Sequence, residues 1–261
     1  MMMSYVQKKI ALTIVTVCLN SEKTIARTIE SVKQQKSHDV EYIIIDGDSH
    51  DGTRDIIRSY GDVIDVFVSE PDKGISDAFN KGIAKSAGDV IGLLNADDQL
   101  LPGTIEKVLR CFHDSPETEI LHSDVLLYEG AQLVKQLRPP RFWWFPWRLV
   151  LFNHPATFVR RSVYDRWGGY RTDYAIAMDV ERFAFWKKKG CRISYLPEPL
   201  VRMVSGGVSG RSGYLGVSEK RKALLDHGYN RLMVELQYVT GLLIQWYLSV
   251  QTPAIRLPVR L

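Results

Sequence analysis

Residues Val90–Gly103, V-I-G-L-L-N-A-D-D-Q-L-L-P-G, decide the fold of this chain. The short apolar run Val90–Leu94 ends abruptly at Asn95-Ala96-Asp97-Asp98, and Pro102 opens a helical pattern. This pattern predicts a buried strand that carries two carboxylates to its C-terminal end. In open α/β sheets, that end of the strands is where ligands bind.

The adjacent acids Asp97 and Asp98 predict a metal site. Two neighbouring carboxylates repel each other, and burying the pair without a cation is costly. A hard divalent ion, Mg²⁺ or Mn²⁺, shared with phosphate oxygens removes that cost. The alternative interpretation is an acidic turn that stays in contact with solvent.

Strand-like and helix-like segments alternate before and after this stretch. We expect strands at Leu12–Cys18, Val40–Ile45 and Val63–Val68, and helices over 25–32, from Thr53 and over 75–86. Asn20 or Ser21 is expected to cap the first helix. The alternation with short loops predicts an α/β fold, with a parallel sheet covered by helices on both faces.

The pattern changes after Phe112. Two runs, 120–127 and 132–137, flank Glu129-Gly130 as in a hairpin. A helix is expected over Val180–Lys189, a mobile loop over 205–216, and mostly helical structure over 219–250 with a break near His227. We therefore divide the chain into a first half (1–115), a second half (116–212) that shares the same sheet, and a helical C-terminal extension (213–261).

Composition narrows the class of protein without naming a partner. The 261 residues are 45% hydrophobic and 25% charged, which is ordinary for a globular protein, and the net charge of +4 is mild. The three cysteines lie far apart in apolar patterns, which indicates reduced thiols and a cytoplasmic protein. The apolar run after Lys8-Lys9 resembles a signal peptide but is interpreted as the first strand. No run reaches the length of a membrane span.

Seven motifs together carry a family resemblance. They are T-V-C-L-N (16–20), I-D-G-D-S-H-D-G-T (45–53), S-E-P-D-K-G-I-S-D-A-F-N-K-G (69–82), G-D-V-I-G-L-L-N-A-D-D (88–98), H-P-A-T-F (154–158), A-M-D-V-E-R-F (177–183) and G-G-V-S-G (206–210). In these motifs and their order, over roughly residues 10–210, the chain resembles the family 2 glycosyltransferases of bacterial polysaccharide biosynthesis. The resemblance implies the GT-A fold, with a mostly parallel central sheet, a donor-binding first half and an acceptor-binding second half.

The resemblance places a nucleoside-diphosphate sugar at the ends of the first strands. Asp46 ends the second strand, where its carboxylate can accept a hydrogen bond from the N–H of uracil or guanine, so the base stays open between UDP and GDP. The alternative for Asp46 is an Asx turn without a ligand. The other candidates for contact with the donor are Thr16, Asn20, Glu22, Asp77, Asn80 and Asn95. For Asn20, helix capping is the competing role.

The acidic triplet of the family maps onto Asn95-Ala96-Asp97, so that Asn95 replaces the first acid. The resemblance therefore implies Asp97 as the main metal ligand and Asp98 as the second, with the ion bridging the two phosphates of the donor. The family often adds a late histidine ligand, and the matching stretch 202–205 has none. Arg202, Arg211 and His154 remain open as groups that contact the diphosphate instead.

Asp179 is the candidate general base. Sugar transfer with inversion needs one carboxylate to take the proton from the acceptor hydroxyl as that oxygen attacks the anomeric carbon. The start of a helix favours the ionised form that a base requires. The competing interpretation is a plain acid in the first turn of a helix, and Glu181 is the fallback base. His154 is expected to bind the acceptor or a phosphate, with a structural role equally open.

Two aromatic segments bear on the acceptor. Phe142–Trp147 lies between arginines, and the tail from Tyr229 to Val250 is apolar with few charges. Both suit a lipid-linked sugar acceptor and a peripheral contact with the inner face of the plasma membrane. The alternatives are core packing or a homodimer interface. No stretch indicates binding of nucleic acid.

Two other classes compete with a transferase. A sugar-phosphate nucleotidyltransferase would need a glycine- and arginine-rich loop after the first strand, and residues 18–22 read C-L-N-S-E instead. A non-catalytic nucleotide-sugar-binding protein on the same fold would be expected to lose Asp97, Asp98 or Asp179, and the chain keeps all three.

Overall fold

The computed structural model describes residues 10–139, 152–205 and 213–251. In the first half, strands and helices alternate as expected: β1 (Leu12–Cys18), α1 (Ile25–Lys33), β2 (Val40–Asp46), α2 (Thr53–Ser59), β3 (Val66–Ser69), α3 (Ile75–Lys85), β4 (Val90–Asn95), β5 (Gln99–Leu100) and α4 (Thr104–Asp114). The expected elements of this half are confirmed, with shifts at their ends.

The second half adds strands of both directions and a helical end. It contains β6 (Ile120–Glu129), β7 (Gln132–Leu137), the short 3₁₀ helix η1 (His154–Ala156), β8 (Thr157–Arg160), α5 (Arg161–Trp167), α6 (Met178–Lys188), β9 (Ile193–Val204), α8 (Gly213–Asp226) and α9 (Arg231–Gln251). The hairpin predicted around Glu129-Gly130 is formed by β6 and β7.

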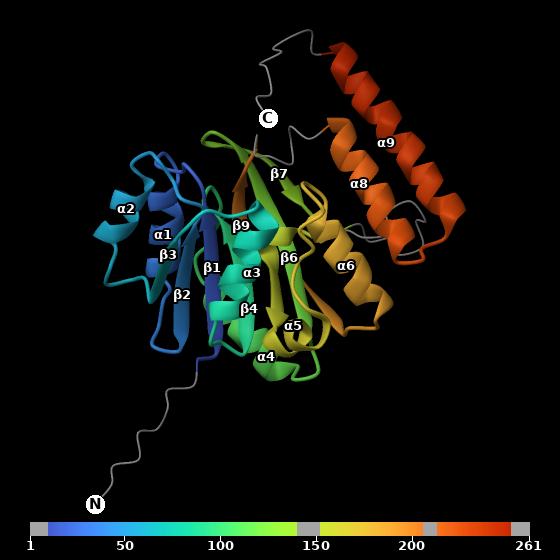
Figure 1. The fold of residues 1–261 in the computed structure, drawn as a ribbon. Helices are drawn as coiled ribbons and strands as arrows, with labels where there is room; N and C mark the ends of the chain where they lie inside the picture. Colours follow the sequence, from blue (N-terminus) through green and yellow to red (C-terminus); the bar gives the residue numbers. More distant parts are fainter. Residues whose placement is uncertain (1–9, 140–151, 206–212, 252–261) are drawn as a thin grey trace, which may run out of the picture.

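One sheet runs through both halves, in the order β3-β2-β1-β4-β8-β6-β9-β5, with β7 beside β6 (Figure 1). The strands β3, β2, β1 and β4 are parallel to one another. Beyond β4 the sheet is mixed, because β8 runs antiparallel to both β4 and β6 while β9 runs parallel to β6. Six of the nine strands in the described residues, β1–β4, β6 and β9, run in the same direction, so the sheet is mostly parallel as expected, with β5, β7 and β8 reversed.

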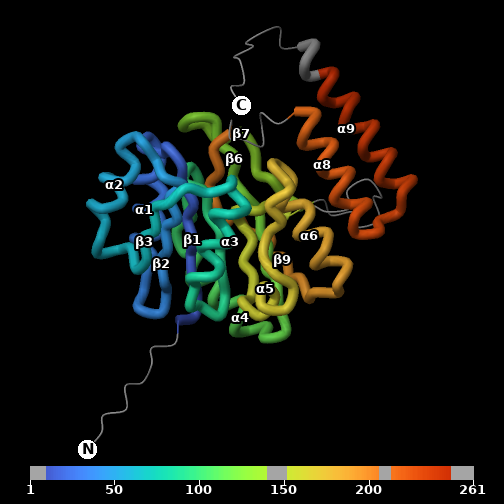
Figure 2. The backbone as a smooth tube through the Cα atoms, viewed as in Figure 1, coloured from blue at the N-terminus to red at the C-terminus, as the bar shows by residue number. Residues whose placement is uncertain are grey.

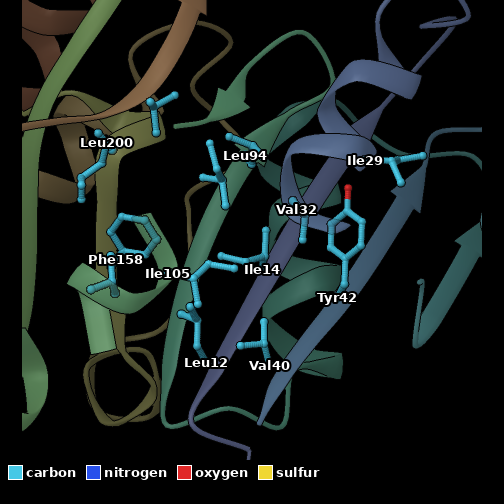
Figure 3. Close-up of a cluster of buried hydrophobic side chains, with 14 of the residues drawn as sticks. Leu12, Ile14, Ile29, Val32, Val40, Tyr42, Leu94, Ile105, Phe158 and Leu200 are labelled. Atoms are coloured by element: carbon cyan, nitrogen blue, oxygen red, sulfur yellow. The ribbon is translucent and has the colours of Figure 1, made fainter. Parts of the chain in front are cut away.

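Helices cover both faces of the sheet, and each face has its own hydrophobic core. Figure 3 shows the first core, in which Ile29 and Val32 of α1 and Ile105 of α4 meet side chains of β1 and β2. The second core contains Phe79 of α3 and Trp186 of α6. A Cβ added to Gly82 would lie 2.2 Å from a methyl carbon of Val15, so only glycine allows α3 to approach β1 this closely. Burial on both faces explains the near-continuous apolar runs of β1, β2 and β4.

Two local expectations are wrong. Neither Asn20 nor Ser21 caps α1 through its side chain: the helix begins after Thr24, and the Asn20 Oδ1 instead accepts the backbone N–H of His50. The loop expected over 205–216 extended too far, because α8 begins at Gly213, and residues 206–212 lie outside the described residues. Gly213 adopts a positive φ of 46°, which glycine tolerates at the start of the helix.

The C-terminal extension is a pair of helices beside α6 (Figures 1 and 2). They are separated near His227 as expected, and Gly228 takes the left-handed φ of 66° that ends α8. Within the described ranges, no helix has the length and apolarity needed to cross a bilayer.

Candidate functional site

The C-terminal ends of β1, β2 and β4 meet at one edge of the sheet. In the strand register, Cys18 of β1 pairs with Asp46 of β2, and Val17 pairs with Asn95 of β4. The loops that follow these strands therefore converge around the end of β1. Most of the side chains predicted to contact a donor lie in or next to these loops.

The acidic turn after β4 is largely shielded from solvent. Asp98 is 1% exposed, and Asp97 is half-buried. Thr28 on α1 fixes the turn, because its Oγ1 lies 2.9 Å and 2.7 Å from the carbonyl oxygens of Ala96 and Asp98. Burial, and then the neighbouring charge of Asp97, raises the pKa of Asp98 well above its ordinary value. Burial likewise raises the pKa of Asp97.

This turn fits a hard divalent cation. The Asn95 amide nitrogen donates to Asp98 at 3.1 Å, which leaves the buried Asn95 Oδ1 without a hydrogen-bond partner. Two carboxylates and one amide oxygen form a donor set of the kind that Mg²⁺ and Mn²⁺ prefer. Among the described residues, no group of three or more His, Cys, Asp or Glu side chains is arranged to hold a metal. The remaining ligands would therefore come from water and from phosphate oxygens.

Asp46 does not point into a ligand site. It is fully buried, and its two oxygens accept from the Ser49 backbone N–H, the hydroxyls of Ser49 and Ser69, and the Cys18 thiol. All the lone pairs of the carboxylate face donors within the protein. The bond from the Ser49 N–H forms the Asx turn that the sequence offered as the alternative, and contact of Asp46 with a base stays a prediction.

Thr16 and Asn80 also have partners within the protein. Thr16 is fully buried in the middle of β1, and its Oγ1 lies 3.1 Å from the hydroxyl of Tyr42. Both ends of the Asn80 amide bond the backbone of Tyr170, at 2.7 Å each. These hydrogen bonds give both side chains a structural role, and their contact with a donor stays a prediction.

Asn20, Glu22 and Asp77 stay near the converging loops. Asn20 and Glu22 are exposed, and their side chains accept the backbone N–H groups of His50 and Gly52 after β2. Asp77, in the first turn of α3, accepts the backbone N–H of Lys73. These contacts join the loops to one another and leave the first two residues open to a ligand.

Asp72, in the motif at 69–82, lies beside the end of β2. Its Oδ1 accepts the Gly74 backbone N–H at 2.8 Å, and a Cβ added to Gly47 would lie 2.4 Å from its Oδ2. The absence of a side chain at Gly47 thus lets this carboxylate approach the end of β2. A glycine directly after the strand was the signal in the sequence for such a close approach.

Asp179 lies in the first turn of α6 as predicted, and it is half-buried. One carboxylate oxygen accepts the Val180 backbone N–H at 2.7 Å. Nearby, His154 is buried among Phe79, Tyr170 and Phe183. Burial lowers the pKa of His154 while the charge of Asp179 acts in the opposite direction, so the two side chains lie within electrostatic reach.

The candidates for contact with the acceptor or a phosphate differ in their surroundings. The low pKa leaves His154 neutral near pH 7, which suits a hydrogen bond more than a charge contact with phosphate. Glu181 is fully buried, with His227 at 2.8 Å and Arg182 at 3.3 Å. Arg202 lies 4.0 Å from the centre of the Tyr128 ring and donates to the Gly130 carbonyl, so it points to the β6–β7 hairpin. Arg211 and Phe142–Trp147 lie outside the described residues.

The chain matches the sequence model for "Glycosyl transferase family 2" over residues 13–171. It belongs to glycosyl transferase family 2. Among curated relatives in the family, an uncharacterized glycosyltransferase of Mycobacterium tuberculosis is 28% identical over 171 residues, which cover 64% of this chain and 65% of the relative. A PGL/p-HBAD biosynthesis glycosyltransferase of Mycobacterium bovis is 26% identical over 172 residues, 62% of this chain and 63% of the relative.

Solved structures confirm the GT-A fold of this family 2 chain. Staphylococcus aureus TarS in complex with UDP superposes with a TM-score of 0.65 at 16% identity, over 93% of this chain and 73% of that one. The mannosyltransferase PcManGT of Pyrobaculum calidifontis, in complex with GDP-Man and Mn²⁺, superposes with a TM-score of 0.62 at 14% identity. The superposition covers 95% of this chain and 77% of PcManGT. At these identities the likeness concerns the fold alone.

Proposed function

We propose that this protein is an inverting glycosyltransferase that moves a sugar from a UDP- or GDP-sugar to a hydroxyl of a glycan or lipid-linked acceptor. One observation carries the proposal: in a family 2 fold, the mutually repelling pair Asp97–Asp98 is shielded from solvent at the edge where the C-terminal ends of β1, β2 and β4 meet. The half-buried carboxylate of Asp179 lies on the acceptor half. A non-catalytic donor-binding protein would have no use for the second carboxylate.

Asp179 acts as the general base. Its carboxylate takes the proton from the acceptor hydroxyl, and the freed oxygen forms a bond to the anomeric carbon of the donor sugar. The bond between that carbon and the phosphate oxygen breaks, and its electron pair leaves with the nucleoside diphosphate. Because attack and departure occur on opposite sides of the carbon, its configuration inverts.

Asp97 and Asp98, with Asn95 as a neutral third ligand, would hold Mg²⁺ or Mn²⁺. When bound, the ion neutralises the charge that develops on the departing diphosphate. The carboxylates also explain why the site would need the cation: their raised pKa values reflect negative charge that the fold shields from water. Asn20 and Glu22 are the donor contacts that remain open to a nucleotide.

The test measures binding of UDP, GDP, CMP and dTDP, each with and without Mn²⁺. Wild type is compared with Asp97→Ala and, as a control, with Ala at the exposed Asp62. We expect one diphosphate to bind tightly with Mn²⁺ in wild type and in the control, and weakly in Asp97→Ala. Absence of binding to every nucleotide would contradict the donor site.

A second variant tests the base separately. Asp179→Asn is expected to bind the diphosphate like wild type and to lose about 10²–10⁴-fold in the rate of transfer, the usual contribution of a general base. Transfer at the wild-type rate would contradict the assignment of Asp179. Intact donor binding without any transfer by wild type would instead favour the non-catalytic protein.

The C-terminal helices favour a lipid-linked acceptor and a peripheral membrane contact. On α9, Leu232, Leu236, Val239 and Leu243 follow one another at three- or four-residue spacing and are each more than 40% exposed. A cavity of about 620 Å³ lies between these helices and the β6–β7 hairpin. Its lining includes Lys135, Arg138, Lys220 and Arg221 and no acid among the described residues. The exposed stripe lies on the face of α9 opposite the residues that line this cavity, and an exposed apolar helix face on a chain of net charge +4 matches an anionic lipid surface.

A further inference from the structure

Three consecutive backbone N–H groups point at one carboxylate from a distant helix. The N–H groups of Ala175, Ile176 and Ala177 donate to Glu219 on α8, at 3.0, 2.8 and 2.9 Å. The first of these bonds uses one carboxylate oxygen, and the other two share the second. Glu219 therefore satisfies the whole segment that leads into α6.

The contact with Glu219 ends at the N-cap residue of α6, so it fixes the entry into the helix, while within the first turn the Asp179 Oδ1 accepts the Val180 N–H. The first backbone N–H groups of a helix have no partner within the helix, and a side chain at the N-cap normally accepts one of them. The N-cap of α6 is Ala177, whose methyl group cannot accept a hydrogen bond. The negative charge of Glu219 also lies at the positive end of the helix dipole.

A second set of contacts holds the other side of the same turn. The buried Glu181 bonds His227, which directly follows α8, at 2.8 Å. The Tyr174 hydroxyl donates to Asp226, the last residue of α8, at 2.9 Å. The residues before and after Asp179 are thus attached to one rigid element, which lies beyond the segment 13–171 that matches the family.

We propose that Glu219 is a positioning residue that orients Asp179 by fixing the backbone before α6. The inference rests on the proposed role of Asp179 as general base. Glu219 touches neither donor nor acceptor; it sets the direction from which the Asp179 carboxylate meets the acceptor hydroxyl. The C-terminal extension of this chain thereby contributes to the reaction through the geometry of the base.

The experiment compares Glu219→Ala and Glu219→Gln with Glu235→Ala as the matched control. Glu235 on α9 also pairs with α8, through Arg221, and this ion pair does not touch the segment before α6. Hydrogen exchange is measured at the amides of 175–177 in the free, full-length protein. Release of nucleoside diphosphate is followed with UDP-GlcNAc and GDP-Man, the donors bound in structures of TarS and PcManGT, with water as the nucleophile that takes the sugar and gives its proton to Asp179.

We expect Glu219→Ala to speed exchange at these amides by about tenfold or more and to lower kcat by about 10–100-fold, the scale of a displaced catalytic group. The donor KM and UDP or GDP binding should stay as in wild type. Glu219→Gln keeps one accepting oxygen, so its exchange rate and kcat should lie between those of wild type and Glu219→Ala. If the alanine variant does not fold, the glutamine variant provides the test. Glu235→Ala should resemble wild type in both measurements.

The measurements distinguish failure of the positioning role of Glu219 from failure of the proposed function. If the amides of 175–177 exchange equally fast in Glu219→Ala and in wild type, these amides are not held by Glu219. If they exchange faster but kcat is unchanged, the positioning role is overturned. Either result leaves the proposed function standing if Asp179→Asn is inactive. Wild-type turnover by Asp179→Asn would overturn the proposed base itself.

Discussion

At the scale of single residues, Asn80 has a structural role. The sequence predicted that this side chain contacts the donor. Its amide makes two 2.7 Å hydrogen bonds to the backbone of Tyr170 and so ties α3 to the loop before α6. We expect Asn80→Ala to lower the free energy of unfolding by about 2–3 kcal/mol, because two buried backbone groups lose their partner. Urea denaturation measures this loss.

The control is Lys85→Ala, at an exposed position on the same helix, which should leave the unfolding curve unchanged. Binding of UDP and GDP to the folded Asn80→Ala protein should match wild type. A variant of normal stability that no longer bound either nucleotide would support the donor role of Asn80.

His122 on β6 makes the fold sensitive to acid. Burial lowers its pKa from 6.5 to about 4, with Asp124 acting weakly in the opposite direction. The unfolded chain therefore takes up this proton as the pH falls through 6.5, while the folded protein takes it up only near 4. Stability is complete above pH 6.5 and is lost towards pH 4, by about 2 kcal/mol at pH 5.

His122→Phe should remove this part of the pH dependence while keeping contacts with Phe152 and Tyr195, which flank the imidazole ring. Urea unfolding at pH 7 and pH 5 checks the prediction, with His38→Gln at an exposed position as the control. An equal loss of stability on acidification in wild type and His122→Phe would refute it.

The sequence predicted the positions of the acids better than their surroundings. Asp97, Asp98 and Asp179 lie where the motifs placed them, because strand ends and helix starts have local signals. The complete burial of Thr16 could not be predicted, because both faces of the central strand β1 are covered and alternation along the strand says nothing about exposure. Glu219 has no local signal at all, since its partners lie 42 to 44 residues away.

At the scale of elements, the contact of α6 with the end of α8 depends on a buried charge. Glu181 has His227 and Arg182 as partners and a side chain that is 1% exposed. We expect His227→Ala to destabilise the protein by about 1.5–3 kcal/mol, since one oxygen of a buried carboxylate loses its donor. Thermal unfolding measures the change.

The double variant His227→Ala with Glu181→Gln should recover part of that loss, because a neutral amide costs less to bury than an unpaired charge. An additive effect of the two changes would contradict a direct interaction between these side chains.

The elements of the first half were predictable, and those of the second were less so. Parallel strands separated by helices follow from short-range patterns and right-handed crossovers. The reversal at β8 and the two-residue strand β5 arise from pairing with strands far away in the chain: β5 pairs with β9, roughly a hundred residues later. Such pairings leave no periodic trace in the sequence.

At the scale of the whole molecule, we expect the protein to bind anionic membranes through α9. Flotation with vesicles of phosphatidylglycerol and phosphatidylcholine should recover wild type, whereas vesicles of phosphatidylcholine alone should recover less. Ser at both Leu236 and Leu243 should reduce binding several-fold without changing the folded structure, because both side chains are exposed. Analytical sedimentation without lipid tests the alternative. If wild type forms a stable dimer and the double variant does not, the exposed stripe on α9 is an interface with a second copy of the chain and not a membrane contact.

The pairing of β5 with β9 has a consequence for how the protein is made. The Asp97–Asp98 turn leads directly into β5, and β5 gains its neighbour only when Val201 and Arg202 have been added. The segment before α6 waits still longer, for Glu219. Because synthesis proceeds from the N-terminus, a chain that ends after α4 has every donor-side motif, and its acidic turn is held by Thr28, without the strand that pairs with β5. We therefore expect the nascent chain to become active only after α8 has been synthesised.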